Sequence, residues 1–401
     1  MTLKYNILVL APHCNTFIEE SVRACSTQIN NASIIVHHNP LSELSTLLPI
    51  GGYFAHVSKF TKKAIAPQYE LPDNVQLHII SFPYITPDAS NRDMADKIAE
   101  QAIKLINKKG LEFDLIHAHF TWPQGGAGAR LKERYDVPLI ITAHGFDIYE
   151  LPFKDANWNG IITQTLNHAD QIITVSNNNV KCLERLNIRT PVTIIPNGFR
   201  ADTFHPLGQT DSIRPKLGLP LRKQIILSVG NLELKKGHET LIESVKSLVK
   251  KNDNLLIVIV GSGQLRARLM KTVDDFGLSD YVVLAGRKPH AEIPLWMNAC
   301  DVFALPSLAE GNPTVMFECL GCGKPFVGTR VGGIPDIITS DDYGLLCEPG
   351  DSKDLADKLM IALEKKWDNE KIVAYSRQFT WEIISKQIIE IYQKAIKGLP
   401  H

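Results

Sequence analysis

The sequence alternates short apolar runs with longer segments of helical character, and the alternation begins a second time near the middle of the chain. Ile-, Val- and Leu-rich runs of this length are typical of strands buried on both faces of a parallel sheet. In the first half they are 7–10, 33–37, 75–80, 115–117, 139–142, 171–175 and 192–195. In the second half they are 225–229, 255–260, 282–284, 302–305, 325–328 and 344–346. With helices predicted between them, such as 91–108 and 125–135, the pattern indicates two doubly wound α/β halves.

A chain of 401 residues is too long for one hydrophobic core and fits two domains. The polar segment 197–222, which contains Pro and Gly, reads as the linker between the halves. We therefore predict an N-terminal domain over 1–200 and a C-terminal domain over 201–380. A last helix, about 381–397, follows the second sheet.

The composition excludes several classes of protein. Lys and Arg total 43, as do Asp and Glu, so nothing supports a general attraction to nucleic acid. The apolar run 7–10 is too short for a signal peptide, and no uncharged run approaches the ~20 residues that cross a bilayer. Seven cysteines, an odd number without a framework, favour reduced thiols in the cytoplasm. The lone pair Cys319 and Cys322 is expected to pack in the core rather than to bind metal.

Two glutamates, Glu310 and Glu318, flank a Gly-Asn-Pro turn that begins at Gly311. Asn312 is a suitable N-cap, and Pro313 suits the first helical position, where a missing amide proton costs nothing. The turn therefore predicts a helix start, with Glu310 on the loop ahead of it and Glu318 in the second turn.

The amides that follow this turn, at Thr314 and Val315, predict a site for a phosphate or diphosphate, because the helix dipole adds to their free N–H groups. One flanking carboxylate could then meet sugar hydroxyls and the other a ribose. An ordinary capped helix with two solvated acids is the alternative that the spacing alone leaves open.

The next stretch, 319–347, is a dense series of glycine turns and short apolar runs, and here the sequence closely resembles the retaining, nucleotide-sugar-dependent glycosyltransferases of family 4. The paired-glutamate motif of that family matches 310–318. Its second glycine signature matches Thr329, Gly332, Gly333 and Pro335. Further matches are His-Ala-His at 117–119, Thr-Ala-His-Gly-Phe-Asp at 142–147, Ile-Pro-Asn-Gly-Phe at 195–199, Lys-Lys-Gly at 235–237 and Gly-Ser-Gly at 261–263.

The resemblance implies the GT-B fold, in which two Rossmann-like domains face each other across a cleft. Domain 1–200 would bind the acceptor and domain 201–380 the nucleotide sugar. The last helix, about 381–401, would cross back to pack on the first domain.

The implied reaction is transfer of a hexosyl group from a UDP- or GDP-linked sugar to a hydroxyl of a sugar or lipid-linked acceptor, with retention. The route implied is front-face attack guided by the leaving diphosphate. No D-x-D site stands in a suitable loop, so we expect no metal and no cofactor besides the donor. The motif set resembles enzymes of surface polysaccharide or lipid-linked glycan synthesis, in the cytoplasm or at the inner face of the membrane.

The resemblance also assigns donor contacts. Glu310 would hold donor-sugar hydroxyls, Glu318 the ribose and Lys236 the diphosphate. Asn231 stands where the family has an Arg, so Lys235 could share that charge. The other expected donor contacts are Gly261, Gly311, Asn312, Pro313, Thr314, Val315 and, beside the nucleobase, Arg287.

His144 follows the strand at 139–142, and the matching family residue lies at the reacting centre, so we assign it contact with the donor sugar. Asp147 could orient this loop. We place His117 and His119 on opposite faces of their strand, with His119 toward the acceptor.

The first loop departs from the family, since it reads Ala-Pro-His-Cys-Asn where many members have two glycines. Asn15 and Thr16 are the candidates to replace them on the acceptor side. The segment 51–66 combines lysines with aromatic residues and could contact an anionic membrane, although a plain surface helix is the more common explanation.

Other functions stay open. Gly261 and Gly263 resemble the start of a dinucleotide fingerprint, but the later glycine is missing. A GT-B phosphorylase or a sugar-nucleotide epimerase would share the architecture. A non-catalytic sugar-nucleotide-binding subunit is a further alternative, because of Asn231 and the altered first loop.

Overall fold

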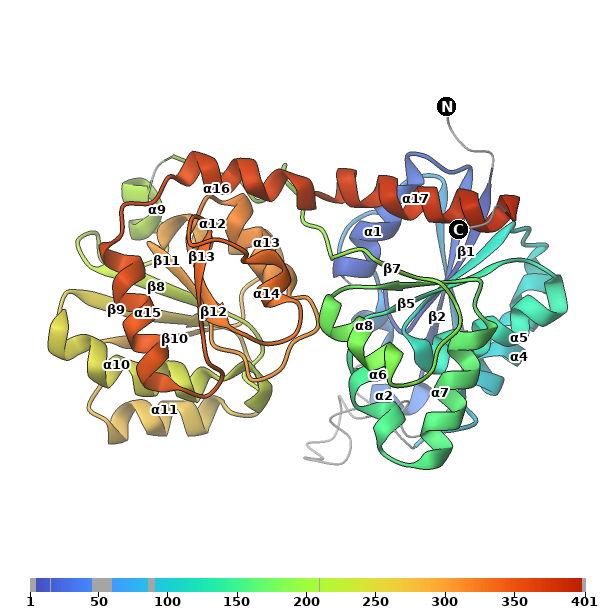
Figure 1. The fold of residues 1–401 in the computed structure, drawn as a ribbon, viewed down its shortest axis with the longest axis horizontal. Coiled ribbons are helices and arrows are strands. Elements are labelled where there is room, and N and C mark those ends of the chain that lie inside the picture. The colour runs from blue at the N-terminus through green and yellow to red at the C-terminus, as the bar shows by residue number, and fades with distance from the viewer. Residues whose placement is uncertain (1–4, 15, 45–59, 86–90, 209, 399–401) are drawn as a thin grey trace. The chain divides into compact units, whose positions relative to one another are not determined.

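The computed structural model describes residues 5–14, 16–44, 60–85, 91–208 and 210–398, which form two compact units (Figure 1). Unit 1 comprises Met1–Asn197 and Trp381–His401, and unit 2 comprises Gly198–Thr380. Each unit is built on one sheet whose strand pairs are all parallel. This confirms the predicted fold class, two doubly wound parallel-sheet domains.

The sheet of unit 1 has seven strands in the order β3-β2-β1-β4-β5-β6-β7. The strands are β1 (Asn6–Ala11), β2 (Asn31–His38), β3 (Val75–Ser81), β4 (Leu115–His119), β5 (Leu139–Ala143), β6 (Gln171–Thr174) and β7 (Val192–Ile194). The helices are α1 (Thr16–Ser26), α2 (Pro40–Leu44), α3 (Lys62–Ile65), α4 (Met94–Lys109), α5 (Gly126–Tyr135), α6 (Phe146–Tyr149), α7 (Ala156–His168), α8 (Asn177–Glu184) and α17 (Trp381–Lys397), with short turns η3 (Thr121–Gly125) and η4 (Leu151–Phe153).

Strand β1 shows how the sheet of unit 1 divides its core into two layers. Leu8 and Leu10 pack in a cluster with α4, α5 and α7 on one face. Ile7 and Val9 point the other way and pack in a cluster with α1 and α17. Because successive side chains of a strand alternate between faces, an uninterrupted apolar run is what a sheet covered on both sides requires.

The sheet of unit 2 has six strands in the order β10-β9-β8-β11-β12-β13. The strands are β8 (Gln224–Val229), β9 (Leu255–Val260), β10 (Val282–Gly286), β11 (Val302–Leu305), β12 (Phe326–Thr329) and β13 (Gly344–Cys347). The helices are α9 (Thr210–Lys216), α10 (His238–Lys251), α11 (Arg266–Asp275), α12 (Ile293–Ala299), α13 (Thr314–Gly321), α14 (Ile334–Ile337), α15 (Ser352–Glu364) and α16 (Asn369–Ser376), with short turns η5 (Leu234–Lys236), η6 (His290–Glu292) and η7 (Arg377–Phe379).

All thirteen predicted strands are present, with ends that differ by at most two residues from the predicted ones. The predicted helices 91–108 and 125–135 correspond to α4 and α5. The prediction for the turn at 311–313 was wrong by one position. Pro313 is the N-cap, with extended backbone, and α13 begins at Thr314, so Asn312 does not cap the helix.

The buried strand β9 gives a stability test. Ile257 lies at its centre and is fully buried, so Ile257→Ala should leave a cavity and lower the free energy of unfolding of unit 2 by about 2–5 kcal/mol. Val283→Ala on the neighbouring strand β10, where Val283 is 40% exposed, is the control and should cost less than about 1 kcal/mol. Urea unfolding measures both, and equal losses would contradict the assigned layers.

Candidate active site

The carboxyl ends of β8 and β11 meet at the same edge of the unit 2 sheet, because these strands are parallel neighbours. The loop after β8 turns at Gly237, whose φ is +64°, and a Cβ atom there would lie 1.9 Å from the carbonyl oxygen of Pro306. The amide of Leu308 donates to the carbonyl oxygen of Lys235 at 2.7 Å. The two loops are therefore in backbone contact, which places Lys236 beside Glu310.

Lys236 and Glu310 form a charged pair at this edge. Lys236 Nζ lies 2.5 Å from Glu310 Oε1, and the Ser307 hydroxyl donates to the same oxygen at 2.6 Å. Their side chains are 17% and 9% exposed. The two residues predicted to act on the donor are thus brought together, and both contacts use one oxygen of the carboxylate.

The start of α13 lies next to this pair in the chain. Thr314 and Val315 occupy its first turn, where N–H groups have no partner within the helix. Asn312 and Pro313 are buried just ahead of them. The helix start therefore keeps the features of an anion site, although its cap differs from the predicted one.

A second glycine turn fixes the loop that carries Glu310. Gly332 has φ +54°, and a Cβ atom there would lie 2.1 Å from the carbonyl oxygen of Glu310. The amide of Gly333 donates to the carbonyl oxygen of Gly311 at 2.7 Å, and the Thr329 hydroxyl donates to that of Ser307 at 2.5 Å. The loop with the second glycine signature therefore holds the backbone of the loop that carries Glu310 in place.

Glu318 pairs with a residue that sequence reasoning missed. His290 Nε2 lies 3.0 Å from Glu318 Oε1, and the Glu318 side chain is 5% exposed. The sequence feature that could have indicated this role is the position of His290, four residues after Gly286 at the end of β10. Ser307, two residues after β11, was missed in the same way.

The remaining donor candidates lie near the same sheet edge but not in the Lys236–Glu310 pair. Lys235 is exposed and pairs with Glu233 at 3.3 Å. Asn231 and Arg287 are exposed. A Cβ atom at Gly261 would lie 1.9 Å from the carbonyl oxygen of Gly230, so Gly261 packs the ends of β8 and β9 together.

In unit 1 the predicted histidines gather at the carboxyl ends of β4 and β5. The prediction that His117 and His119 point to opposite faces was wrong. Their ring centroids are 4.4 Å apart, because residues two apart on a strand share a face. His119 Nδ1 lies 3.1 Å from His144 Nε2, so His119 is the immediate partner of His144.

The loop that carries His144 is held by Asp147, which is buried. Its carboxylate accepts from the amides of Gly145 at 2.9 Å and Thr121 at 2.6 Å. Burial raises the pKa of Asp147, and these hydrogen bonds oppose the shift. The ring of His144 packs against those of Phe17 and Phe120, with centroids 4.9 and 4.6 Å away.

Burial also disfavours the charged form of the histidines. It lowers the pKa of His117 to about 3, and the neighbouring His144 adds to the effect. Burial lowers the pKa of His119 and of His144 well below the usual value, again with help from neighbouring histidines. Burial therefore favours the neutral form of all three rings, in which His144 can donate or accept a hydrogen bond.

Part of the predicted acceptor side is not described. Asn15 lies outside the described residues, and of Thr16 only the backbone at the start of α1 is described. The segment 51–66 lies outside them as far as residue 59, and α3 is in its remaining part. Within the described residues, no helix is long and apolar enough to cross a membrane, and no group of three or more His, Cys, Asp or Glu side chains could hold a metal ion.

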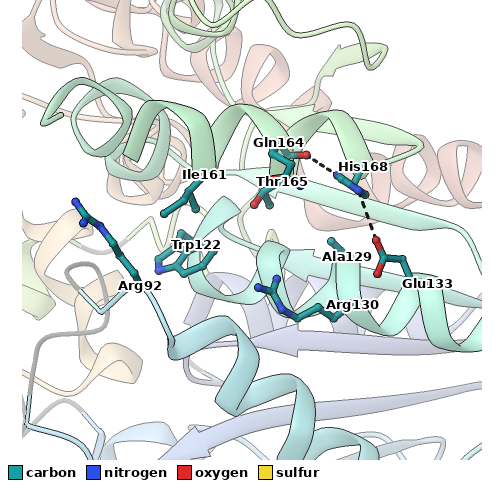
Figure 2. Close-up of a pocket in the computed structure, with 9 residues that line it drawn as sticks. All are labelled: Arg92, Trp122, Ala129, Arg130, Glu133, Ile161, Gln164, Thr165 and His168. Atoms are coloured by element: carbon teal, nitrogen blue, oxygen red, sulfur yellow. Dashed lines mark hydrogen bonds and ion pairs between the residues drawn. The ribbon is translucent and has the colours of Figure 1, made fainter. Parts of the chain in front are cut away.

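A cavity of about 350 Å³ opens in unit 1 among α5, α7 and η3 (Figure 2). It contains none of the predicted site residues. Its charged side chains are already paired: Arg92 with Asp155, Arg130 with Asp96, and His168 with Glu133. We therefore place the chemistry at the strand ends and not in this cavity.

Two family profiles match the chain. The profile described as Glycosyl transferases group 1 matches residues 209–379, and the profile described as Glycosyltransferase Family 4 matches residues 56–203. The chain is 28% identical over 301 residues to a protein named for teichuronic acid biosynthesis, the glycosyltransferase TuaC of Bacillus subtilis, covering 75% of this chain and 74% of that one. It is also 28% identical over 314 residues to D-inositol 3-phosphate glycosyltransferase of Corynebacterium jeikeium. That match covers 73% of this chain and 75% of the relative.

Solved structures show the same fold. Sucrose-phosphate synthase from Thermosynechococcus elongatus matches with a TM-score of 0.77 at 19% identity, over 98% of this chain and 100% of that one. HepE of Anabaena, solved in complex with UDP, matches with a TM-score of 0.74 at 18% identity. That match covers 98% of this chain and 100% of HepE.

The histidine cluster predicts a pH dependence of stability. An unfolded His titrates near pH 6.5 but folded His117 only near 3, so between these values the unfolded chain binds more protons and stability falls as the pH falls. From pH 7 to 5, His117 alone should lower the free energy of unfolding by about 2 kcal/mol. Urea unfolding of the wild type and His117→Gln at both pH values measures this.

The variant should lose less stability on acidification than the wild type does. His168→Gln, at a partly exposed histidine on α7 outside this cluster, is the control for the loss of an imidazole elsewhere in unit 1. An unchanged pH dependence in His117→Gln would contradict the assignment.

Proposed function

Because the chain belongs to the glycosyltransferases of family 4 and has their GT-B fold, we propose that it transfers a hexosyl group from a UDP- or GDP-linked sugar to an acceptor hydroxyl, with retention. The observation that carries this proposal is the Lys236–Glu310 pair beside the start of α13. It joins a cation, a carboxylate and a helix N-terminus at one sheet edge, which are the groups that a sugar diphosphate needs.

The leaving diphosphate is the proposed ligand of Lys236 and of the amides at Thr314 and Val315. An ammonium has three N–H donors, and within the described residues Lys236 uses one of them, to Glu310. It can therefore keep this contact and still donate to a phosphate oxygen. Stabilising the negative charge that develops on the diphosphate lowers the barrier electrostatically.

Glu310 is proposed to hold the donor sugar. Its Oε1 accepts from Lys236 and Ser307, which fixes the carboxylate and leaves Oε2 to accept from sugar hydroxyls. Glu318 is proposed to accept from the ribose hydroxyls. His144 of unit 1 is the third proposed catalytic group, as a neutral hydrogen-bonding contact to the reacting sugar.

Relatives support the donor class. HepE was solved with UDP and also with UDP-glucose, and a trehalose-6-phosphate protein of Escherichia coli, with a TM-score of 0.70 to this chain, was solved with UDP-2-fluoro glucose. The name of TuaC supports an acceptor in polysaccharide synthesis. We propose a sugar or lipid-linked acceptor bound by unit 1, and action in the cytoplasm or at the inner face of the membrane.

Substituting Glu310 tests the proposal. Glu310→Gln keeps the shape but weakens the contacts to Lys236 and to the sugar, so kcat should fall by a factor of about 100–1000 with little change in the Kd for the nucleoside diphosphate. Transfer and hydrolysis of UDP- and GDP-sugars measure kcat, and calorimetry measures Kd. Glu364→Gln, on the exposed face of α15, is the control and should be fully active.

Full activity of Glu310→Gln would contradict the catalytic assignment. Donor binding by the wild type without transfer or hydrolysis would instead favour a non-catalytic sugar-nucleotide-binding subunit, the alternative that Asn231 in the place of the family's Arg suggests.

Metal independence is a separate prediction. Lys236 and the α13 amides can take the place of a cation beside the diphosphate, so EDTA should leave the transfer rate unchanged. The measurement is the initial rate with EDTA, with added Mg²⁺ as the comparison. Loss of activity in EDTA that Mg²⁺ restores would show that these groups do not suffice.

A further inference from the structure

His290 and Glu318 come from different elements that the fold brings together. His290 opens the turn η6 after β10, and Glu318 lies in the second turn of α13. His290 Nε2 is 3.0 Å from Glu318 Oε1, and the side chains are 22% and 5% exposed. Within the described residues, no other side chain hydrogen-bonds to the Glu318 carboxylate.

A carboxylate buried to this degree needs a donor, because removing it from water without a partner is costly. The dipole of α13 favours the charge but does not fix the orientation of the side chain. The bond to His290 fixes one oxygen of the carboxylate. It leaves the other, Oε2, to accept from a ligand.

The imidazole is itself held against α13. Its ring packs on that of Phe204, with centroids 5.3 Å apart, and Phe204 is fully buried. The carbonyl oxygen of Phe204 would lie 2.8 Å from a Cβ atom at Gly321, near the end of α13. The same helix therefore positions both the carboxylate and the wall behind its hydrogen-bond donor.

Neighbouring basic side chains do not take this role. Lys288 places its ammonium over the ring of Trp296, 5.2 Å from the centroid, and Arg287 is exposed. His290 is the basic residue of this turn that reaches the carboxylate.

We infer that His290 is a positioning residue that orients the Glu318 carboxylate to receive the ribose hydroxyls of the nucleotide donor. The inference rests on the proposed function, since it takes Glu318 as the ribose contact. His290 acts through Glu318 and touches no reacting atom. It donates from Nε2–H, so a side chain that keeps an N–H at this place should replace it.

The test compares the wild type with His290→Phe, which keeps a ring against Phe204 but has no donor, and with His290→Gln, which keeps an N–H donor. Calorimetry with UDP and GDP selects the nucleotide that binds. His290→Phe should weaken its binding about tenfold, as expected for a lost hydrogen bond to a charged group. His290→Gln should stay within about threefold of the wild type.

The 2′,3′-dideoxy analogue of the same nucleotide separates positioning from a structural role. This analogue lacks the ribose hydroxyls from which Glu318 would accept hydrogen bonds. His290→Phe should therefore bind the analogue as tightly as the wild type does. A double-mutant cycle combines His290→Phe with Glu318→Gln. The double variant should bind the nucleotide no more weakly than Glu318→Gln alone, because both substitutions remove the same interaction. His205→Phe, at an exposed histidine of the same unit, is the control for loss of an imidazole.

Three results would overturn the inference: unchanged or tighter nucleotide binding by His290→Phe, an equal loss for the ribose and dideoxy forms, or additive effects in the cycle. If His290→Phe does not fold, His290→Asn, whose amide is too short to reach Glu318, takes its place with the same expectations. If the wild type binds neither UDP nor GDP, the proposed donor function fails with the inference. If Glu318→Gln weakens binding and His290→Phe does not, the inference fails alone.

Discussion

The backbone contact between Gly237 and Pro306 is the constraint on which the candidate site depends. It joins the loops after two neighbouring parallel strands, β8 and β11, at a distance that no side chain at position 237 would permit. The left-handed conformation of Gly237 would cost another residue roughly 1–2 kcal/mol even without the clash. Because both loops are fixed in this way, Lys236 and Glu310 meet without reorganising the fold.

In unit 2, Arg214 and Lys236 both pair with a carboxylate, but they differ in how many of their N–H groups the protein itself binds. Arg214 is buried and donates to Asp301 and to the carbonyl oxygens of Ala299, Leu221 and Lys223, so the protein satisfies it on every side. Lys236 makes one side-chain hydrogen bond within the described residues and keeps two N–H groups for a ligand. Arg214 therefore stabilises the fold, whereas Lys236 is arranged to receive an anion.

The fold was predictable because its signal is local. Each strand is a short apolar run, and the parallel arrangement then requires helices on both faces. The pairing of Lys236 with Glu310 was predictable only in outline, since sequence places both at strand ends but does not give the distance. His290 was missed because its role depends on Glu318, 28 residues away, and on Phe204 behind it. The wrong placement of His117 and His119 had a different cause. Side chains alternate between the two faces of a strand, so residues two positions apart lie on the same face.

The polar groups of unit 1 connect the last helix of the chain to the loop that carries His144. The hydroxyl oxygen of Tyr392 on α17 lies 2.7 Å from His117 Nδ1, and His117 Nε2 lies 2.7 Å from the hydroxyl oxygen of Thr142 on β5. The ring of His117 packs beside that of His119, which contacts His144. Both ring nitrogens of His117 are hydrogen-bonded, so a shift of Tyr392 or Thr142 would leave a buried polar group unpaired. The hydrogen bonds that seat α17 on the sheet therefore end at the histidine that packs on the partner of His144, although Tyr392 and His144 lie far apart in the sequence.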